Sequence, residues 1–362
     1  MAAITASGAT SMIGREALAQ QSGAAVDRQA GPLNLITDVP GLQVGQAEDA
    51  GVRTGVTVIL PDVPAVAACD VRGGGPATRE TDVLRPENLV QEVDGIVLSG
   101  GSVFGLGAAD GIAAWMGARN RGFTFRPTPG IPPSPILPTA CLYDLANGGD
   151  KAWETDPPYR ELGVAAVEST DRAFGLGTAG AGYGANSGGL KGGLGSASTV
   201  TGDGMTVGAI VAVNSFGSAI APDSRQFWAA PWEIDGEFGG LGTNELRAGP
   251  ESYRREIPPR ENTTLACIAT DVALSRVELQ RIAIMAQDGM ARALRPAHAP
   301  FDGDIVFALS TAQQAASEDT PRPVLTMRLG ALAADVLARA IARAVYEATA
   351  FPDTGIPAWK DL

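Results

Sequence analysis

The stretch Arg260-Glu-Asn-Thr-Thr-Leu-Ala-Cys-Ile-Ala-Thr-Asp271 runs from polar residues into an apolar, β-prone segment that predicts a buried strand over residues 265–271. Within it, Asn262-Thr263-Thr264 matches the N-x-[ST] pattern of N-glycosylation. Glycan acceptors lie on exposed loops, whereas this one leads directly into a predicted core strand. Either the match is accidental, or the peptide bond between Asn262 and Thr263 has another use.

Other short runs of apolar and β-branched residues predict further strands, at residues 55–60, 65–70, 95–99, 206–213 and 304–310. Most of these runs are continuously apolar, which is typical of sheets covered on both faces. Helices are predicted at residues 102–115, at 275–293 behind the capping box Ser275-Arg-Val-Glu278, and at 326–349. Residues 127–138 and 223–260 are predicted to be connections. The pattern predicts one domain of mixed α/β layers over residues 32–362.

Composition limits the expected partners. The 362 residues carry a formal net charge of -13 and no Lys/Arg block, which argues against nucleic acid and against an anionic membrane. A small-molecule or oligopeptide substrate is therefore expected. Residues 1–31 are rich in Ala, Ser and Gly and lack a signal-peptide pattern, so they predict a mobile tail and a cytoplasmic protein. No stretch is apolar enough to predict a transmembrane span.

The chain has a single histidine, His298, in the loop Pro296-Ala-His-Ala-Pro300. Ser-His-Asp and Cys-His catalysis and most zinc sites need at least one imidazole, so only this residue could serve them. Its proline-flanked loop favours a solvated or packed histidine instead. Three isolated cysteines without CxxC spacing predict core thiols, at Cys69, Cys141 and Cys267. No metal or organic cofactor is expected.

Three glycine clusters invite comparison with phosphate loops: Arg72-Gly-Gly-Gly75, Ser99-Gly-Gly-Ser102 and residues 175–198. None has the G-x-x-x-x-G-K-[ST] pattern or G-x-G-x-x-G in its required context, so nucleotide binding is a weak hypothesis. The second cluster predicts a tight turn with close helix-sheet packing, although a helix N-terminus there could hold a carboxylate. Lys191, in the third, is either a surface lysine in a loop or a packed lysine whose charge acts on a neighbouring group.

Thr263 starts the predicted strand and is a candidate nucleophile. A threonine hydroxyl is a weak nucleophile alone, but a cut just before Thr263 would free an α-amine that can act as general base for the same hydroxyl. Such an amine has an unperturbed pKa of about 7.7 to 8.0, so a good fraction is free base near neutral pH. This chemistry needs no histidine.

Three more polar residues could serve that nucleophile. Asp302 and Asp304 flank a glycine, and in an extended chain both side chains point to one face, where they could orient the amine and relay a proton. Their alternative is a strand-entry turn, where Asp-Gly is common. Asn214 ends a predicted strand and could donate its amide to a developing oxyanion, or could be a turn residue. From spacing alone the two interpretations of Asn214 stay equal.

Six motifs occur in order along the chain: Ile36-Thr-Asp-Val-Pro-Gly41, Asp70-Val-Arg-Gly-Gly-Gly-Pro76, Leu98-Ser-Gly-Gly-Ser-Val-Phe-Gly105, Gly189-Leu-Lys-Gly-Gly-Leu-Gly-Ser196, Asn262-Thr-Thr264 and Asp302-Gly-Asp304. Together they resemble the autoprocessing aminopeptidases grouped with L-aminopeptidase/D-esterase. That group includes the β-peptidyl aminopeptidases and the nylon-oligomer (6-aminohexanoate oligomer) endo-hydrolases. The Asn-Thr junction and the Asp-Gly-Asp pair are most similar to the latter, since the aminopeptidases generally carry Gly-Ser and a serine or glutamate there.

The resemblance implies an α/β fold, a four-layer αββα sandwich of N-terminal-nucleophile-hydrolase type. It also implies self-cleavage between Asn262 and Thr263 into chains 1–262 and 263–362, which stay associated, usually as a homotetramer. Thr263 would be the nucleophile, and the matching active-site positions are Lys191, Asn214, Asp302 and Asp304. Tyr143 matches a tyrosine that lines the same pocket, and its alternative is an interfacial aromatic with a satisfied hydroxyl.

These observations predict a hydrolase of amide bonds in short amino-acid oligomers, such as 6-aminohexanoate (nylon) oligomers or similar unusual amides. The first alternative is an aminopeptidase acting on β- or D-/L-amino-acid peptides and amides. The second is an autoprocessing acyltransferase, similar to the ornithine acetyltransferases, which acetyl-ornithine turnover would reveal. A non-enzymatic small-molecule binder built on the glycine loops remains if neither self-cleavage nor amide hydrolysis occurs.

Overall fold

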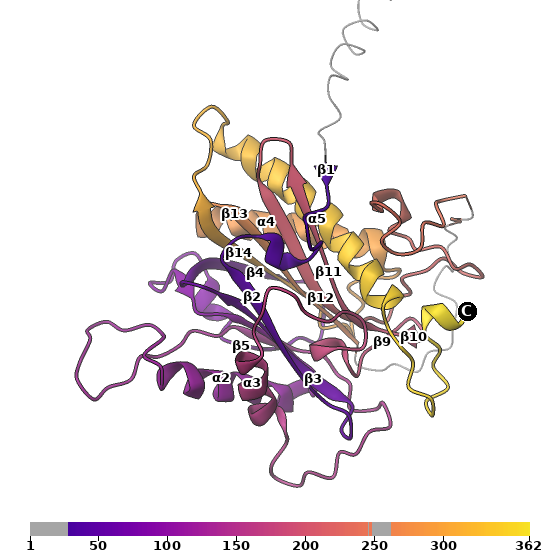
Figure 1. Cartoon of the computed structure of the whole chain (residues 1–362), viewed down its shortest axis with the longest axis horizontal. Helices are drawn as coiled ribbons and strands as arrows, with labels where there is room; N and C mark the ends of the chain where they lie inside the picture. Colours follow the sequence, from indigo (N-terminus) through magenta and orange to yellow (C-terminus); the bar gives the residue numbers. More distant parts are fainter. Residues whose placement is uncertain (1–27, 245, 248–261) are drawn as a thin grey trace, which may run out of the picture.

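The fold is that of a computed structural model, in which residues 28–244, 246–247 and 262–362 are described. In this part of the chain, two large sheets and four α-helices make up the framework (Figure 1). The larger sheet has seven strands, in the order β1 (Arg28–Gln29), β11 (Gly193–Thr201), β12 (Thr206–Asn214), β13 (Thr263–Val272), β14 (Ile305–Gln314), β4 (Ala65–Val71) and β6 (Glu92–Val93).

The smaller sheet has five strands, in the order β2 (Leu42–Asp49), β3 (Thr54–Pro61), β7 (Ile96–Ser99), β8 (Thr139–Cys141) and β5 (Ala77–Arg79). A separate hairpin pairs β9 (Asn186–Ser187) with β10 (Leu190–Lys191). The α-helices are α2 (Ala108–Gly117), α3 (Tyr159–Glu168), α4 (Arg276–Ala293) and α5 (Arg322–Tyr346). Short 3-10 helices lie at Ile36–Asp38, Asp82–Leu84, Ser102–Gly107, Gly180–Gly182, Ala230–Trp232 and Trp359–Asp361.

Three buried apolar clusters hold these elements together. The first packs α4 and α5 against one face of the seven-stranded sheet, and the second fills the space between the two sheets. The third packs α2 and α3 against the other face of the five-stranded sheet. Figure 1 shows the two helix pairs on opposite sides of the strands.

Strand β13 shows why the core strands are continuously apolar. Side chains alternate between the two faces of a strand. Leu265 and Cys267 point into the cluster between the sheets, whereas Ala266 and Ile268 belong to the cluster under the helices. All ten residues of β13 are buried. The prediction of sheets covered on both faces is therefore confirmed for this strand.

The six predicted strands are present as β3, β4, β7, β12, β13 and β14, and the predicted helices as α2, α4 and α5. The capping box that starts α4 is formed, with the backbone N–H of Ser275 donating to Glu278 Oε2 at 2.8 Å. The helix expected from residue 102 is a 3-10 helix as far as Gly107 and becomes α-helical at Ala108.

Strand β11 was not predicted, because its first six residues lie in the glycine cluster at residues 175–198. Packing against α5 explains the small residues of β11. A Cβ added to Gly195 would lie 1.9 Å from the backbone oxygen of Ala340 on α5, so only glycine lets the helix come this close. A strand selected for helix contact thus carries a sequence typical of a loop.

The predicted tail boundary at residue 31 is too late. Arg28–Gln29 pairs with Thr201 and Val200 of β11, and the backbone N–H of Gly31 donates to Ser198 Oγ at 3.1 Å. Residues 1–27, the rest of that prediction, lie outside the described residues. Within the described residues, every helix is too short or too polar to cross a bilayer.

Candidate active site

Strand register brings the predicted junction and the acid pair together. Asn214 is the antiparallel partner of Thr263, and Asn262 forms a parallel bridge with Asp302. The same offset continues into β13 and β14, where Leu265 pairs with Ile305. Gly303 consequently lies beside Thr263, and a Cβ added there would be 2.7 Å from Thr263 Oγ1. The last residue of β12 and the first residues of β13 and β14 therefore meet at one edge of the larger sheet.

The carbonyl oxygen of Asn262 accepts two hydrogen bonds. Thr263 Oγ1 donates to it at 2.5 Å, and the backbone N–H of Gly303 donates to it at 2.8 Å. Asn262 and Thr263 are buried, with exposed fractions of 9% and 4%. The hydroxyl therefore lies next to the carbonyl that it would attack, and that carbonyl already has an N–H donor on its oxygen. Such a donor is what a developing oxyanion requires.

The two predicted acids accept hydrogen bonds from different groups. Asp304 Oδ1 accepts the backbone N–H of Thr264 at 2.8 Å, which ties this acid to the start of β13. Asp302 Oδ2 accepts the N–H of Ala299 at 2.7 Å, and its Oδ1 accepts that of Phe216 at 3.4 Å. Burial, helped by the neighbouring charge of Asp304, raises the pKa of Asp302 to about 6. A carboxyl group with this pKa can exchange protons near neutral pH.

The first glycine cluster supports the loop that carries these acids. The N–H of Gly75 donates to the carbonyl of Asp302 at 2.9 Å, and that of Gly73 donates to the carbonyl of Asp304 at 3.1 Å. A Cβ on Gly73 would lie 2.2 Å from the backbone nitrogen of Asp304. Gly73 thus lets two backbones approach closely, which explains this glycine without any phosphate.

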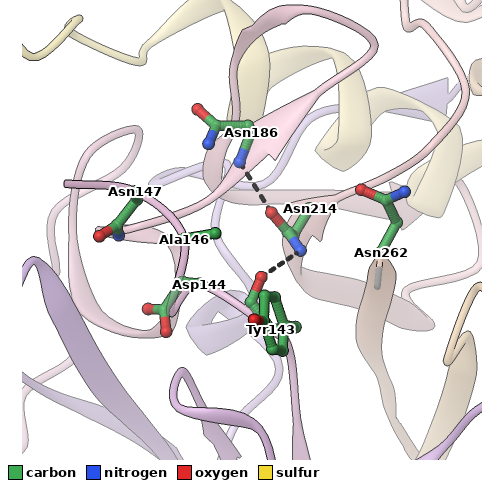
Figure 2. Close-up of a pocket in the computed structure, with 7 residues that line it drawn as sticks. All are labelled: Tyr143, Asp144, Ala146, Asn147, Asn186, Asn214 and Asn262. Atoms are coloured by element: carbon green, nitrogen blue, oxygen red, sulfur yellow. Dashed lines mark hydrogen bonds between the residues drawn. The ribbon is translucent and has the colours of Figure 1, made fainter. Parts of the chain in front are cut away.

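Asn214 is fixed at both ends of its amide (Figure 2). Its Oδ1 accepts the backbone N–H of Asn186 at 2.9 Å, and its Nδ2 donates to the backbone carbonyl of Tyr143 at 2.9 Å. An amide nitrogen carries two hydrogens, so the Tyr143 carbonyl uses only one of them. The contact between these two predicted site residues therefore involves the backbone of Tyr143.

A small pocket opens at this place, and Figure 2 shows the residues that line it: Tyr143, Asp144, Ala146, Asn147, Asn186, Asn214 and Asn262. The junction residue and the candidate oxyanion donor therefore face the same space. The buried carboxylate in this wall, Asp144, accepts Thr54 Oγ1 and the N–H of Gly101, each at 2.7 Å. Burial raises the pKa of Asp144 to about 6. The second glycine cluster therefore does bind a carboxylate, but this carboxylate is the side chain of Asp144 in the same chain.

Lys191 is a packed lysine, and its interpretation as a surface residue is wrong, since only 1% of it is exposed. Its Nζ donates to the backbone carbonyls of Ala185 at 2.8 Å, Gly192 at 2.9 Å and Gly182 at 3.3 Å. Burial lowers the pKa of Lys191 to about 7, opposed by the charge of Asp144. These contacts are with backbone oxygens, so Lys191 would act on the site through its charge.

Two further groups join the site that sequence interpretation did not include. One is the backbone N–H of Gly303, described above. The other is His298, whose Nδ1 lies 2.8 Å from Asp304 Oδ2. The sequence offered one signal for it, a sole imidazole six residues before Asp304, but the flanking prolines favoured a solvated or packed histidine. For the backbone amide there was no side-chain signal at all.

Comparisons with known proteins agree over most of the chain. The sequence profile of peptidase family S58 matches residues 34–355. A Mycobacterium tuberculosis (strain ATCC 25618 / H37Rv) protein described as an uncharacterized aminopeptidase is 40% identical over 355 residues, covering 91% of this chain and 98% of that protein. A 6-aminohexanoate-oligomer endohydrolase of Agromyces sp. (strain KY5R) is 29% identical over 294 residues, covering 78% of this chain and 77% of that enzyme.

A solved structure extends the likeness to the fold. The L-aminopeptidase D-Ala-esterase/amidase of Ochrobactrum anthropi, described as a variant of the Ntn hydrolase fold, aligns with a TM-score of 0.65 at 24% identity. The alignment covers 94% of this chain and 93% of that one. The two chains therefore share the arrangement of their sheets and helices.

Proposed function

This chain belongs to peptidase family S58 and is an amide-bond hydrolase, and we propose that it activates itself by cutting its own Asn262–Thr263 bond. The family resemblance drawn from the six motifs is confirmed, and so is the prediction of an amide hydrolase. One observation carries the self-cleavage proposal: the Thr263 hydroxyl and the Gly303 N–H both bond to the Asn262 carbonyl oxygen.

In the proposed first step, Thr263 Oγ attacks the carbonyl carbon of Asn262. The C–O bond forms, the C–N bond to Thr263 breaks, and the nitrogen leaves as an amine after taking a proton. Water then hydrolyses the resulting ester, which frees the Thr263 hydroxyl and leaves a carboxylate on Asn262. Through this step the Gly303 N–H stabilises the negative charge on the Asn262 oxygen.

The uncut chain needs another base for this step, because the nitrogen of Thr263 is then an amide. We assign that role to Asp302, which lies opposite Asn262 and whose pKa is raised to about 6. A base with such a pKa is mostly ionised at neutral pH, yet it still binds a proton strongly enough to accept one from a hydroxyl. Asp304 and Lys191 set the local charge and the position of the strand ends.

The pH dependence of self-cleavage tests this assignment. Asp302 must lose its proton to act as a base, so the cleavage rate of freshly folded precursor should rise between about pH 5 and pH 7 and then level off. Asp302→Asn should remove this rise and slow cleavage at every pH. Gel densitometry of timed samples measures both. A wild-type rate that stays constant from pH 5 to pH 7 contradicts the role of Asp302.

Substitution of Gly303 tests the contact at the junction. The added Cβ in Gly303→Ala would lie 2.7 Å from Thr263 Oγ1, so the hydroxyl must move from its position against the Asn262 carbonyl. Misplacement of a reacting group by about 1 Å can cost about 10²-fold, and we expect self-cleavage to slow by that order.

The matched control is Gly75→Ala, in the loop that supports the acids. A Cβ there meets nothing closer than the Asp302 oxygen at 3.9 Å, so self-cleavage should stay close to the wild-type rate. Mass spectrometry over a time course compares the two variants. Equal rates for Gly303→Ala and Gly75→Ala would show that the position of the Thr263 hydroxyl beside Gly303 is not needed for self-cleavage.

In the mature enzyme the freed Thr263 amine would activate the same hydroxyl against a substrate amide, and water would resolve the acyl-enzyme. We propose that the second hydrogen of Asn214 Nδ2 then binds the substrate oxyanion, since this side chain lines the pocket and is held by Asn186 and Tyr143. Tyr143 shapes the pocket and fixes Asn214 through its carbonyl. All six predicted site residues thus keep a proposed role: Thr263, Lys191, Asn214, Asp302, Asp304 and Tyr143.

For the substrate we propose amides of short amino-acid oligomers, with 6-aminohexanoate oligomers as the leading case. The relative that acts on them and the Asn-Thr junction support this choice. Aminopeptidase activity on β-, D- or L-amino-acid peptides is the second candidate, favoured by the relative at 40% identity. A panel of 6-aminohexanoate oligomers, β-peptides and D-amino-acid amides separates the two, because only the preferred class should reach the highest kcat/KM.

The finer architecture is also a proposal. We infer a four-layer αββα sandwich of the N-terminal-nucleophile type, supported by the three apolar clusters that alternate with the two sheets and two helix pairs. The homotetramer that the resemblance implies is a further proposal, and native mass spectrometry tests it.

A further inference from the structure

The chain's only histidine contacts Asp304, one acid of the pair, and nothing in the proposed mechanism uses it. We propose that His298 is a positioning residue: its ring holds Asp304 as a charged acceptor at the start of β13, so that Asp302 is left to carry the moving proton. The inference rests on the proposed function, because it concerns the same self-cleavage and hydrolysis.

The geometry identifies the ring nitrogen as a donor. Asp304 Oδ2 lies 2.8 Å from His298 Nδ1 and 3.0 Å from the backbone nitrogen of His298. A carboxylate only accepts hydrogen bonds, so Nδ1 carries the hydrogen whether the ring is neutral or charged. The side chain of His298 is 24% exposed, while that of Asp304 is 2% exposed. The imidazole therefore lies between solvent and a buried acid.

Asp304 is surrounded by donors on both oxygens. The Thr264 N–H donates to Oδ1, and the backbone N–H and the ring Nδ1 of His298 donate to Oδ2. Hydrogen bonds from N–H groups stabilise the charged form of a carboxylate. Because the Thr264 N–H is next to the nucleophile in the chain, rotation of the Asp304 carboxylate would shift Thr263 as well.

Asp302 is in a different environment from Asp304, and this difference gives the two acids separate roles. Burial and the charge of Asp304 raise the pKa of Asp302, and the charge of His298 lowers it. Asp304 and His298 are thus titratable groups whose charges act on the Asp302 carboxyl group in opposite directions. Two carboxyl groups whose environments differ in this way are the usual sign of separate roles. In the proposal, Asp304 accepts the hydrogen bonds that hold it at the start of β13, and Asp302 exchanges the proton.

The backbone at His298 limits which substitutions test this idea. Its φ is +57°, a left-handed conformation that Asn adopts more readily than most residues. His298→Asn keeps this backbone and places an amide donor near the position of Nδ1. His298→Leu removes the donor and keeps a side chain of similar bulk, although it strains the left-handed backbone. The pair therefore separates loss of the hydrogen bond from loss of the ring.

We expect His298→Leu to slow both self-cleavage and substrate hydrolysis by up to about 10²-fold, the order of loss when a reacting group is misplaced by about 1 Å. His298→Asn should restore the rates on the pH plateau to within a few-fold of wild type. In both variants the rise in rate near the pKa of Asp302 should move to higher pH, because the histidine charge that lowers this pKa is gone. The shift reports the charge of His298, whereas recovery of the plateau rate in His298→Asn reports the hydrogen bond to Asp304.

The inference is overturned if His298→Leu matches wild type in both plateau rate and pH profile. A wild-type chain that neither cuts itself nor hydrolyses amides would instead sink the proposed function, so the two failures are distinct. If His298→Leu does not fold, the untagged wild type still decides, because its sole imidazole gives unambiguous ¹⁵N NMR signals. The neutral ring must carry its hydrogen on Nδ1, and hydrogen on Nε2 alone would refute the proposal.

Discussion

Thr263→Ala should give a single uncut chain of 362 residues without measurable amide hydrolysis. The substitution removes the hydroxyl that lies 2.5 Å from the Asn262 oxygen, so neither the acyl shift nor the later attack on substrate can occur. Loss of a catalytic nucleophile costs on the order of 10⁴-fold or more in kcat. Intact mass and a denaturing gel measure the cleavage, and product release from an oligomer substrate measures the activity.

Thr263→Ser is the matched control for this experiment. It keeps the attacking oxygen and removes only a methyl group, so the chain should still cut itself and retain activity within about tenfold, although the methyl no longer restricts χ1. Fragments that end at Asn262 in the Thr263→Ala variant would show that another group breaks the bond. The nucleophile assignment would then fail, whatever the activity of the serine variant.

Asn214→Ala should separate the two reactions. In the uncut chain the donor on the Asn262 oxygen is the Gly303 N–H, while Asn214 Nδ2 donates to the Tyr143 carbonyl. Self-cleavage should therefore continue, whereas hydrolysis of added substrate should fall by about 10²- to 10³-fold, as when an oxyanion donor is removed. The loss should appear in kcat, because the donor acts mainly on the transition state.

Asn186→Ala provides the comparison within the same pocket. Its backbone N–H, which holds Asn214 Oδ1, is kept, and only a lining side chain is lost. We expect self-cleavage to continue at the wild-type rate and hydrolysis to change far less than in Asn214→Ala. A folded Asn214→Ala protein that does not cut itself would mean that one donor serves both reactions, and the assignment of Gly303 would be wrong.

The sequence predicted those parts of the molecule where side-chain type and local pattern agree. Continuous apolar runs located the core strands, and the Ser275 capping box located the start of α4. The conflict between a glycosylation pattern and a buried strand led to Asn262 and Thr263 as the cleavage junction, which stays a prediction. In each case the signal lies within a few residues, so no knowledge of long-range contacts was needed.

What could not be predicted depends on contacts between distant segments. The Gly303 N–H has no side-chain signature, and its place beside the junction follows only from the parallel register of β13 and β14. Likewise, Gly195 is selected by the approach of α5, which makes a core strand resemble a loop. Lys191 is buried and donates to three backbone carbonyls only once the loop has folded. The glycines around it permit this conformation, but they do not specify it.

The parallel pair β13 and β14 lies in the middle of the larger sheet, between β12 and β4. A cut before Thr263 would place this pair in the fragment 263–362, while its neighbours on both sides belong to the fragment 1–262. Once separated, such fragments would have to find each other by diffusion, without the effective concentration that one chain provides. The bond should therefore break only after folding is complete.

Under the proposed mechanism, the geometry of the junction would enforce that order. Gly303 reaches the Asn262 carbonyl only when β13 and β14 are in the correct register, and a slip by one residue would move Asp302 and Asp304 to other partners. Self-cleavage would then serve as a proofreading step, in which a misregistered chain remains a single inactive polypeptide. A correctly folded chain, by contrast, would commit itself irreversibly to the two-fragment state.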